Sequence, residues 1–465
     1  MATLVPAAVL GLIGAIVART SSSRLLDLAV DRSALLWVVV TIAVLWSLWI
    51  ALIWRTYTRH RTHPAPLALR VAGAFGVAVM CAAVSAPMAM GARYAVVQRD
   101  LIGSVFGGEV SATAPKVTKE NPWGKRDRVN VLLLGGDGAV HRPGVRTDSV
   151  MLASISVKTG RTVLFSLPRN LREVPFKPGS KLAELYPDGF TDGGSEPNAN
   201  YFLNAVYRDV PLLHPGVLGR SDNEGADAIK LAVAGALGIR VDYYALVNLA
   251  GFQRLVDAIG GITVNINEPV PIGGNTDAHI PPDSYLQPGP DQRLNGFKAL
   301  WFTRGRYGST DYKRMQRQRC AINAIVAEAS PVKLLKRYTK LASASKEIVR
   351  TDIPQQLLAA FVDLADKVKG QPIRSVSFER SDAFDPNAPD FDYVHAAVQA
   401  ALYPNRAAQP TSGPTSGATL AAAGTPGTST ARTPSGASTT AAEPAKASDA
   451  ASDCAYHPTT ETAAG

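Results

Sequence analysis

Cysteine is scarce in this chain, with three in 465 residues. Cys81 lies in a hydrophobic run, Cys320 ends a basic stretch, and Cys454 lies near the C-terminus. No CxxC pair or Cys/His spacing suggests a zinc site. A Cys320–Cys454 disulfide is conceivable if both residues lie outside the cell, but the sequence leaves this pairing open.

Several catalytic motifs are also missing. The chain has no GxSxG nucleophile elbow, no HExxH zinc motif and no P-loop. It therefore does not resemble the hydrolases, metalloproteases and nucleotide-binding proteins that these motifs mark. The GGDG sequence at 135–138 resembles a phosphate-binding turn only loosely, and an ordinary turn is the simpler interpretation.

The C-terminal region lacks the residues that build a core. From Pro404 onward there is no Ile, Val, Phe, Trp or Met, and Ala, Thr, Ser, Gly and Pro dominate. Such a segment cannot bury enough apolar surface to offset the entropy lost on ordering. Residues 403–465 are therefore predicted to form a disordered tail.

The N-terminal region has long apolar runs. Residues 34–54 form an uncharged run of 21 residues, and residues 71–92 form a second one. Each meets the roughly 20 residues that a helix needs to cross a bilayer. Residues 2–18 are apolar too, and they either span the membrane or form a signal-like segment. Residues 1–97 are predicted to be a membrane region with two to three transmembrane helices.

The loops predict the orientation of these helices. The loop 55–70 carries four arginines and no acid, whereas the loop 19–32 also contains Asp27 and Asp31. The positive-inside rule places the more basic loop in the cytoplasm, so everything after residue 97 is expected outside the cell. The formal net charge of +10 would allow a nucleic acid partner, but this location disfavours one.

Residues 128–402 read as one α/β domain with a mixed central sheet covered by helices, preceded by a juxtamembrane linker over 98–127. Short apolar or alternating runs bounded by turn residues predict strands, and 3.6-residue periodicity predicts helices. The predicted strands are 128–136, 148–157, 161–169, 241–249 and 262–266, and the predicted helices are 226–237, 251–260, 311–328, 332–349 and 353–369.

The two strands 148–157 and 161–169 are predicted to form a hairpin. A two-residue turn centred on 158–159 or 159–160 places Arg169 opposite Asp148 or Val150. Arg146, Asp148 and Arg169 then gather at the open end of this hairpin. Asp137 follows the preceding strand and could reach the same end.

The stretch LWFTRGRYGSTDYKRMQRQR, residues 300–319, holds six basic residues around a single acid, Asp311. If its first part is extended, Arg304 and Arg306 point to the same side and repel each other unless an anion lies between them. Arginine suits bidentate phosphate contacts, which makes a pyrophosphate a natural occupant. A solvated basic helix end with ordinary surface pairs is the alternative.

The helix that follows is expected to add a polar edge to this stretch. At 100° per residue, Asp311, Arg314 and Gln318 fall within about a 60° arc that borders an apolar stripe. Carboxylates beside arginines are what a magnesium–pyrophosphate site requires, although Asp137 and Asp148 also suit ordinary turns.

Taken together, these residues resemble the LytR-CpsA-Psr family of bacterial cell-wall phosphotransferases, with features of its actinobacterial members. The matching segments are VLLLGGDG, RTDSVMLASISVKTGRTVLFSLPRN, NANYFLNAVY, GIRVDYYALVNLAGFQRLVDAIGGITVNI and LNGFKALWFTRGRYGSTDYKRMQRQR. They occur in order over about 130–330. The chain departs from the family pattern at Asn170, where an acid is common, and at Arg319, where a second Gln is usual.

The resemblance implies a hydrophobic pocket for a polyprenyl chain, opening on an arginine-rich site for the lipid pyrophosphate and Mg²⁺ or another divalent cation. It implies transfer of a glycan-1-phosphate from the lipid carrier to peptidoglycan. The residues that match metal positions are Asp137 and Asp148; those that match pyrophosphate positions are Arg146, Arg169, Arg304 and Arg306; those of the closing helix are Asp311, Arg314, Arg317 and Gln318. Arg304, Arg306, Asp148 and Asp311 are the expected catalytic residues.

Two other functions stay open on this evidence. The chain could hydrolyse the lipid pyrophosphate, or it could bind the lipid as a regulatory wall protein without turnover. The sequence identifies neither the glycan nor the base for the acceptor hydroxyl, for which Asp148 and Asp311 are the two candidates.

Overall fold

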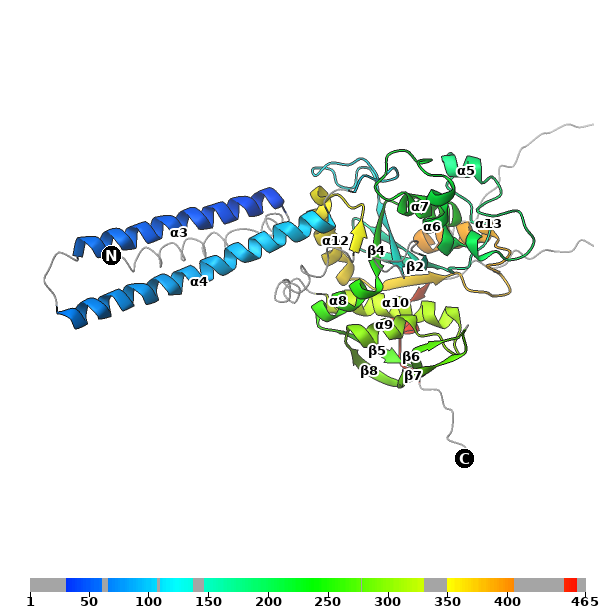
Figure 1. The fold of residues 1–465 in the computed structure, drawn as a ribbon. Coiled ribbons are helices and arrows are strands. Elements are labelled where there is room, and N and C mark those ends of the chain that lie inside the picture. The colour runs from blue at the N-terminus through cyan, green and yellow to red at the C-terminus, as the bar shows by residue number, and fades with distance from the viewer. Residues whose placement is uncertain are drawn as a thin grey trace, which may run out of the picture.

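The structure is a computed structural model that describes residues 31–60, 66–106, 109–136, 146–276, 278–329, 349–404 and 447–457. Two long helices lie side by side and project from a globular α/β body (Figure 1). The predicted helix 332–349 lies almost wholly outside the described residues, as do the apolar run 2–18 and Asp137.

The projecting helices are α3, Arg32–His60, and α4, Leu67–Val105. Both are long and apolar enough to cross a membrane. The Trp46 indole Nε1 donates to Ser85 Oγ at 2.8 Å and ties the two helices together. At 1.5 Å per residue, the 39 residues of α4 span about 58 Å, well beyond the ~30 Å of a bilayer core. The helix therefore continues past the predicted span into the segment expected to be a linker.

The rest of that segment does not behave as a linker. Glu109 accepts a hydrogen bond from Arg350 Nε at 2.9 Å. Ser111 Oγ and the Ala112 backbone N–H donate to the buried Asp227 carboxylate at 2.6 and 2.8 Å. Because these contacts join 109–112 to the central helix and sheet, the α/β domain begins before residue 128, where the sequence placed it.

The body is built on a seven-stranded mixed sheet of order β11-β10-β3-β2-β1-β4-β9. The β1–β4 and β3–β10 pairs are parallel and the other pairs are antiparallel, which confirms the predicted mixed sheet. The strands are β1 Arg128–Gly136, β2 Thr147–Ser156, β3 Thr162–Leu167, β4 Tyr243–Asn248, β9 Val349–Thr351, β10 Ile373–Ser377 and β11 Ser448–Asp449.

The hairpin of β2 and β3 has one of the two predicted registers. Val150 pairs with Leu167 and Ile155 with Thr162, and continuing this register sets Asp148 opposite Arg169. Gly160 closes the turn with φ of 75°, and a Cβ there would lie 2.5 Å from the Lys367 carbonyl oxygen. Only glycine allows this conformation and this close approach.

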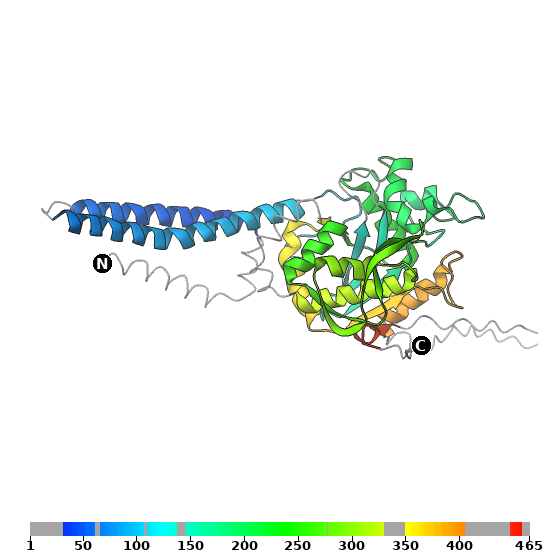
Figure 2. The same cartoon turned by 60° about the horizontal axis from the view of Figure 1, so that its bottom comes forward.

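Helices cover both faces of the sheet (Figure 2). Inward side chains of β1, β2 and β3, such as Phe165, pack in a large core with α6 Leu203–Leu213, α7 Glu224–Leu237 and α13 Phe391–Leu402. The opposite face packs against α10 Asp311–Glu328 and α12 Leu358–Lys369. Ile322 and Val326 of α10 contact this face, as the predicted apolar stripe requires.

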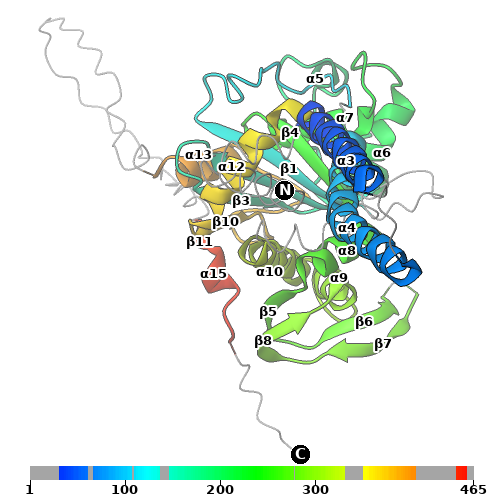
Figure 3. The same cartoon turned by 90° about the vertical axis from the view of Figure 1, so that its left-hand side faces the viewer.

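A smaller layer packs below α10 and contains two short antiparallel sheets (Figure 3). It consists of α8 Leu249–Ile259, β5 Ile262–Ile266, β6 Val270–Asn275, β7 Ile280–Leu286, β8 Gly289–Leu294 and α9 Gly296–Arg304. The short helices α5 Lys181–Leu185, η1 Ala199–Tyr201 and η3 Gln355–Leu357 complete the described domain. The predicted helix 251–260 and strand 262–266 are confirmed.

The prediction of a disordered tail over 403–465 is wrong for residues 447–457. There, β11 pairs with the edge strand β10, and α15, Ala450–Asp453, packs against α10. A Cys320–Cys454 disulfide, with 5.5 Å between the Cα atoms, fixes the segment to α10. The disulfide and the pairing with β10 order this segment, although its composition alone would not. We call residues 447–457 the C-terminal strap.

Candidate functional site

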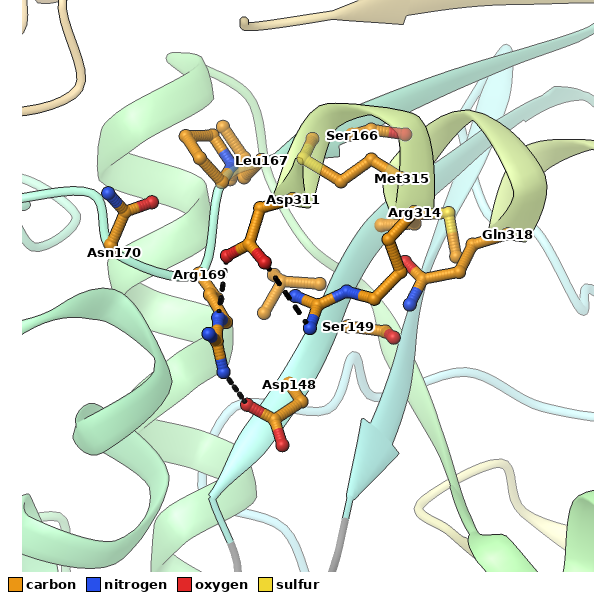
Figure 4. A pocket seen from close by; sticks show the side chains of 13 residues that line it. Asp148, Ser149, Ser166, Leu167, Arg169, Asn170, Asp311, Arg314, Met315 and Gln318 are labelled. Atoms are coloured by element: carbon orange, nitrogen blue, oxygen red, sulfur yellow. Dashed lines mark hydrogen bonds and ion pairs between the residues drawn. The ribbon is translucent and has the colours of Figure 1, made fainter. Parts of the chain in front are cut away.

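The open end of the β2–β3 hairpin forms the first half of the site. Arg169 Nη1 donates to Asp148 Oδ1 at 2.9 Å, the contact that the hairpin register predicts. Arg169 Nε donates to Asp311 Oδ2, also at 2.9 Å. The Arg169 guanidinium thus lies between two carboxylates from β2 and α10 (Figure 4).

Helix α10 supplies the second half. Thr310 caps its N-terminus by accepting from the Lys313 backbone N–H, which fixes where the helix begins. Asp311, Arg314 and Gln318 then face the hairpin together and line one small pocket with Met315 (Figure 4). The predicted arc beside an apolar stripe is confirmed.

Asp311 organises the arginines. Its carboxylate lies 3.5 Å from Arg314 Nη1 and 3.9 Å from Arg306 Nη1, in addition to its bond with Arg169. Burial by itself would raise the pKa of Asp311, but the attraction of Arg314, then of Arg169 and Arg306, outweighs it and holds this pKa below its usual value. The group is therefore a poor proton acceptor at neutral pH and serves to hold the arginines in place.

The arginines of α10 carry more positive charge than the site neutralises. Burial lowers the pKa of Arg314, and burial followed by repulsion from Arg314 lowers the pKa of Arg317 to about 10. The Nε atoms of both are buried and have no hydrogen-bond partner among the described residues. Buried cations in this condition are stabilised by an anion that restores the missing charge and acceptors.

The pocket itself is tight. Its volume is about 10 Å³, which is room for about one water molecule. A phosphate group must therefore bind at its mouth or displace the side chains that close it. The long apolar pocket implied by the family resemblance stays a prediction.

The basic segment before α10 differs from its prediction. Arg304 is the last residue of helix α9, and its guanidinium lies 5.6 Å from the centre of the Trp301 ring. The segment is thus helical and not extended at Arg304, so the backbone geometry from which the side-by-side arrangement with Arg306 was predicted is wrong. Arg306 instead lies near Asp311, and Arg317 Nη2 donates to the Gly305 carbonyl between them.

The remaining predicted residues are partly placed. Arg146 Nη2 donates to Asn200 Oδ1 at 2.9 Å, and Arg208 Nη2 reaches the same oxygen at 3.2 Å. Arg146 therefore faces η1, on the other side of the hairpin end from α10. Asp137 lies outside the described residues.

One carboxylate at the site suits a divalent cation. Asp148 uses Oδ1 for Arg169, while its Oδ2 has no hydrogen-bond partner among the residues described, and the side chain is 37% exposed. Magnesium commonly takes one or two carboxylates together with phosphate oxygens and water. In the described part of the chain, no group of three or more His, Cys, Asp or Glu side chains could hold a metal, and Asp137, the second predicted metal residue, lies outside that part.

Sequence reasoning missed several residues at the site. Ser149 and Met151 of β2 and Ser166 of β3 line the pocket on the sheet face covered by α10. Strand alternation could have identified them, because they lie two residues apart or pair across the hairpin. Asn200 was also missed, although it stands in a matching segment and accepts from two arginines.

Comparison with known proteins decides the family. The LytR_cpsA_psr family profile matches residues 107–403, well over half of the chain, and includes most of the segment expected to be a linker. The chain belongs to the LytR-CpsA-Psr family. It is 29% identical over 231 residues to biofilm regulatory protein A of Streptococcus mutans, covering 48% of this chain and 50% of that protein.

A second relative is the polyisoprenyl-teichoic acid–peptidoglycan teichoic acid transferase TagU of Bacillus cereus, 27% identical over 242 residues, with 52% of this chain and 65% of that protein covered. The chain thus spans between half and two thirds of the length of these two relatives. One similar solved structure is TagV of B. subtilis, with 24% sequence identity and a TM-score of 0.41; the match covers 59% of this chain and 97% of that one. Another is TagT bound to LIIa-WTA, with 19% sequence identity and a TM-score of 0.40; the match covers 63% of this chain and 97% of that one.

Proposed function

We propose that this protein is a membrane-anchored phosphotransferase that moves a glycan-1-phosphate from a polyprenyl-pyrophosphate carrier to peptidoglycan. The observation that carries the proposal is the buried, undercompensated arginine cluster at the meeting point of β2, β3 and α10. Family membership and the teichoic acid transferase named among the relatives support the same reaction class.

In this proposal, the acceptor hydroxyl oxygen attacks the phosphorus nearer the sugar. The bond from that phosphorus to the bridging oxygen breaks, and polyprenyl phosphate leaves with the electron pair. Arg169, Arg306 and Arg314 would neutralise charge on the phosphoryl oxygens and on the leaving phosphate. Such positioning and charge stabilisation is most of what phosphoryl transfer requires of a protein.

Asp148 would hold Mg²⁺ or another divalent cation together with the pyrophosphate. When bound, the cation would withdraw charge from the phosphate oxygens. Asp148 Oδ2 would either hold the cation or accept the hydroxyl proton, and where it holds the cation the proton would pass to the leaving phosphate. Both oxygens of Asp311 face arginines, which makes Asp311 the weaker candidate for the base. Asp311 would hold the arginine side chains in position around the pyrophosphate.

The two helices α3 and α4 would place this chemistry beside the lipid carrier. With the loop 55–70 in the cytoplasm, the catalytic domain faces the outside of the cell membrane, where peptidoglycan is available. The proposal is thus a multi-pass membrane enzyme with an extracytoplasmic active site.

The test is product analysis with the purified full chain in detergent. Lipid-linked glycan is incubated with Mg²⁺, with and without peptidoglycan, and the products are identified by mass spectrometry. A glycan joined to peptidoglycan through one phosphate is expected. Release of glycan phosphate alone in the presence of acceptor would show a hydrolase, and donor binding without any product would show a lipid-binding protein; either result overturns the proposal.

A further inference from the structure

A second cavity lies on the same side of the sheet as the arginine cluster. Its volume is about 420 Å³, within the range of small-ligand sites. Ser377 of β10 lines it and pairs in register with Ser166 of β3, which lines the arginine pocket. Gln316 and Arg319 of α10 line the cavity, while Met315 and Gln318 line the arginine pocket. The two sites are therefore neighbours along one helix and one sheet edge.

The chemistry of this cavity is unlike that of a lipid pocket. Among the described residues that line it, every side chain is a hydroxyl, an amide, a charged group or an aromatic ring, and none is aliphatic. Tyr393 forms one wall and stacks on Phe384, with the two rings inclined by 25°. An aromatic wall beside convergent hydrogen-bonding groups offers both apolar contact and polar recognition.

Arg319 is the central polar group. Its side chain is 7% exposed, and it donates to Ser377 Oγ at 2.7 Å and to the Glu379 carboxylate at 3.4 Å. Its Nε is buried without a hydrogen-bond partner in the described part of the chain. Arg319 is therefore a well-ordered charged group in the lining of the cavity.

The C-terminal strap supplies the opposite wall. The Asp453 carboxylate accepts from Ser375 Oγ at 3.1 Å and from Ser448 Oγ at 2.5 Å, and the Gln316 amide donates to the Asp453 carbonyl at 3.0 Å. Arg319 and Asp453 directly precede Cys320 and Cys454, which form the disulfide. The cross-link therefore holds both walls of the cavity at a fixed separation.

The charge of the cavity selects against anions. Arg319 contributes one positive charge, while Glu379 and Asp453 contribute two negative ones. A phosphate, a carboxylate-rich peptide or a second pyrophosphate would meet net repulsion here. A neutral molecule rich in hydroxyls matches the donors, the acceptors and the aromatic wall together.

From this geometry we propose that the cavity is a subsite for a neutral saccharide. The inference deepens the proposed function and rests on it for its biological source, because a sugar bound here would lie beside the phosphate to be transferred. The saccharide could belong to the donor glycan or to the peptidoglycan strand, and its binding would orient that substrate toward the arginine cluster.

The binding test uses N-acetylchitotetraose as the neutral probe and the full chain in detergent, measured by saturation-transfer-difference NMR. Wild type is expected to bind the probe saturably, and inorganic pyrophosphate should not displace it. Arg319→Gln and Tyr393→Ala should each weaken binding at least tenfold. Arg380→Gln is the matched control, since Arg380 is exposed and pairs with Asp385 outside the cavity. Glu379→Gln should also weaken binding, and because it keeps the size of the side chain, a loss of binding in this variant is not caused by a void in the fold.

Transfer assays with the same variants identify the source of the sugar. A higher KM for the lipid-linked donor with unchanged kcat assigns the subsite to the donor, and a higher KM for peptidoglycan assigns it to the acceptor. The inference is overturned if the probe does not bind wild type, if it binds all variants equally, or if neither KM changes while wild type is active. Saccharide binding without any transfer by wild type would contradict the proposed function and leave the subsite standing.

Discussion

Arg169 is the residue on which the site depends most. It bonds one carboxylate from β2 and one from α10, so it joins the two halves of the site through charge-assisted hydrogen bonds. Around it, Arg306 and Arg314 share the single carboxylate of Asp311. The arrangement leaves net positive charge in a small, partly buried space. A bound pyrophosphate would neutralise this charge.

Asp311 should make the stability of the domain depend on pH. Its pKa is below the ordinary value of 3.8 in the folded protein, so its charge stabilises the fold above that value. This stabilisation is lost as the pH falls from 3.8 through the lower folded-state pKa. Asp311→Asn should lower the melting temperature at pH 6, and the difference from wild type should shrink below about pH 4.

Melting curves between pH 3 and pH 6, followed by tryptophan fluorescence, measure this effect. Asp127→Asn is the control, because Asp127 pairs with Lys158 at the surface and both side chains are about 80% exposed. A difference between wild type and Asp311→Asn that stays constant over the whole range would contradict the role given to this carboxylate.

For single residues, the sequence predicted the contacts that strand register and helical spacing determine. Hairpin register set Asp148 against Arg169, and helical spacing brought Asp311, Arg314 and Gln318 together. The position of Arg304 could not be predicted this way. It depends on where α9 ends. At that end Gly305 packs closely against β6, since a Cβ on it would lie 2.4 Å from the Pro271 carbonyl oxygen, and such a tertiary contact has no local sequence signal.

At the scale of elements, α10 connects the arginine cluster to the C-terminal strap. Its first turns carry the site residues, its apolar stripe packs on the sheet, and its Cys320 is cross-linked to Cys454. The strap adds a two-residue strand that composition cannot reveal, because two residues carry no periodic pattern. Strands β1 to β5 and helices α7, α8, α10 and α12 carry a periodic pattern and were predicted, whereas β9, β10, α6 and α13 were not.

Reduction of the disulfide should destabilise the domain. The bond closes a loop with a sequence separation of 134, and removing a native disulfide typically costs about 2–4 kcal/mol. Dithiothreitol should lower the melting temperature of wild type by several degrees and leave a Cys320→Ser/Cys454→Ser variant unaffected. Thiol labelling of unreduced, denatured protein should modify Cys81 alone; labelling of all three cysteines would contradict the cross-link.

At the scale of the whole molecule, α4 is both one of the two long apolar helices and a neighbour of the α/β domain. The helix ends at Val105, and the following segment hydrogen-bonds to Asp227 and Arg350 within a few residues. Leu358 of α12 also packs against the apolar cluster that contains Ile102 of α4, so α4 contacts the α/β domain directly. Under the proposed function, this contact would keep the site near the membrane that carries the lipid substrate.

Protease treatment of intact bacterial cells that express the chain tests its orientation. Proteinase K should remove the α/β domain from intact cells, because the basic loop 55–70 places that domain outside. A cytoplasmic marker protein should stay uncut as the control for membrane integrity. Digestion of the domain only after permeabilisation would reverse the topology and contradict the proposed access to peptidoglycan.

The central claim is that the arginine cluster binds and activates the pyrophosphate, and the transfer rate of Arg169→Ala tests it most directly. The measurement is kcat/KM for joining lipid-linked glycan to peptidoglycan, with Arg161→Ala, an exposed arginine at the far end of the same hairpin, as the control. Arg169→Ala should lose at least about 100-fold, or about 2.7 kcal/mol, and the control should lose none. Transfer by a folded Arg169→Ala variant at the wild-type rate would contradict the claim.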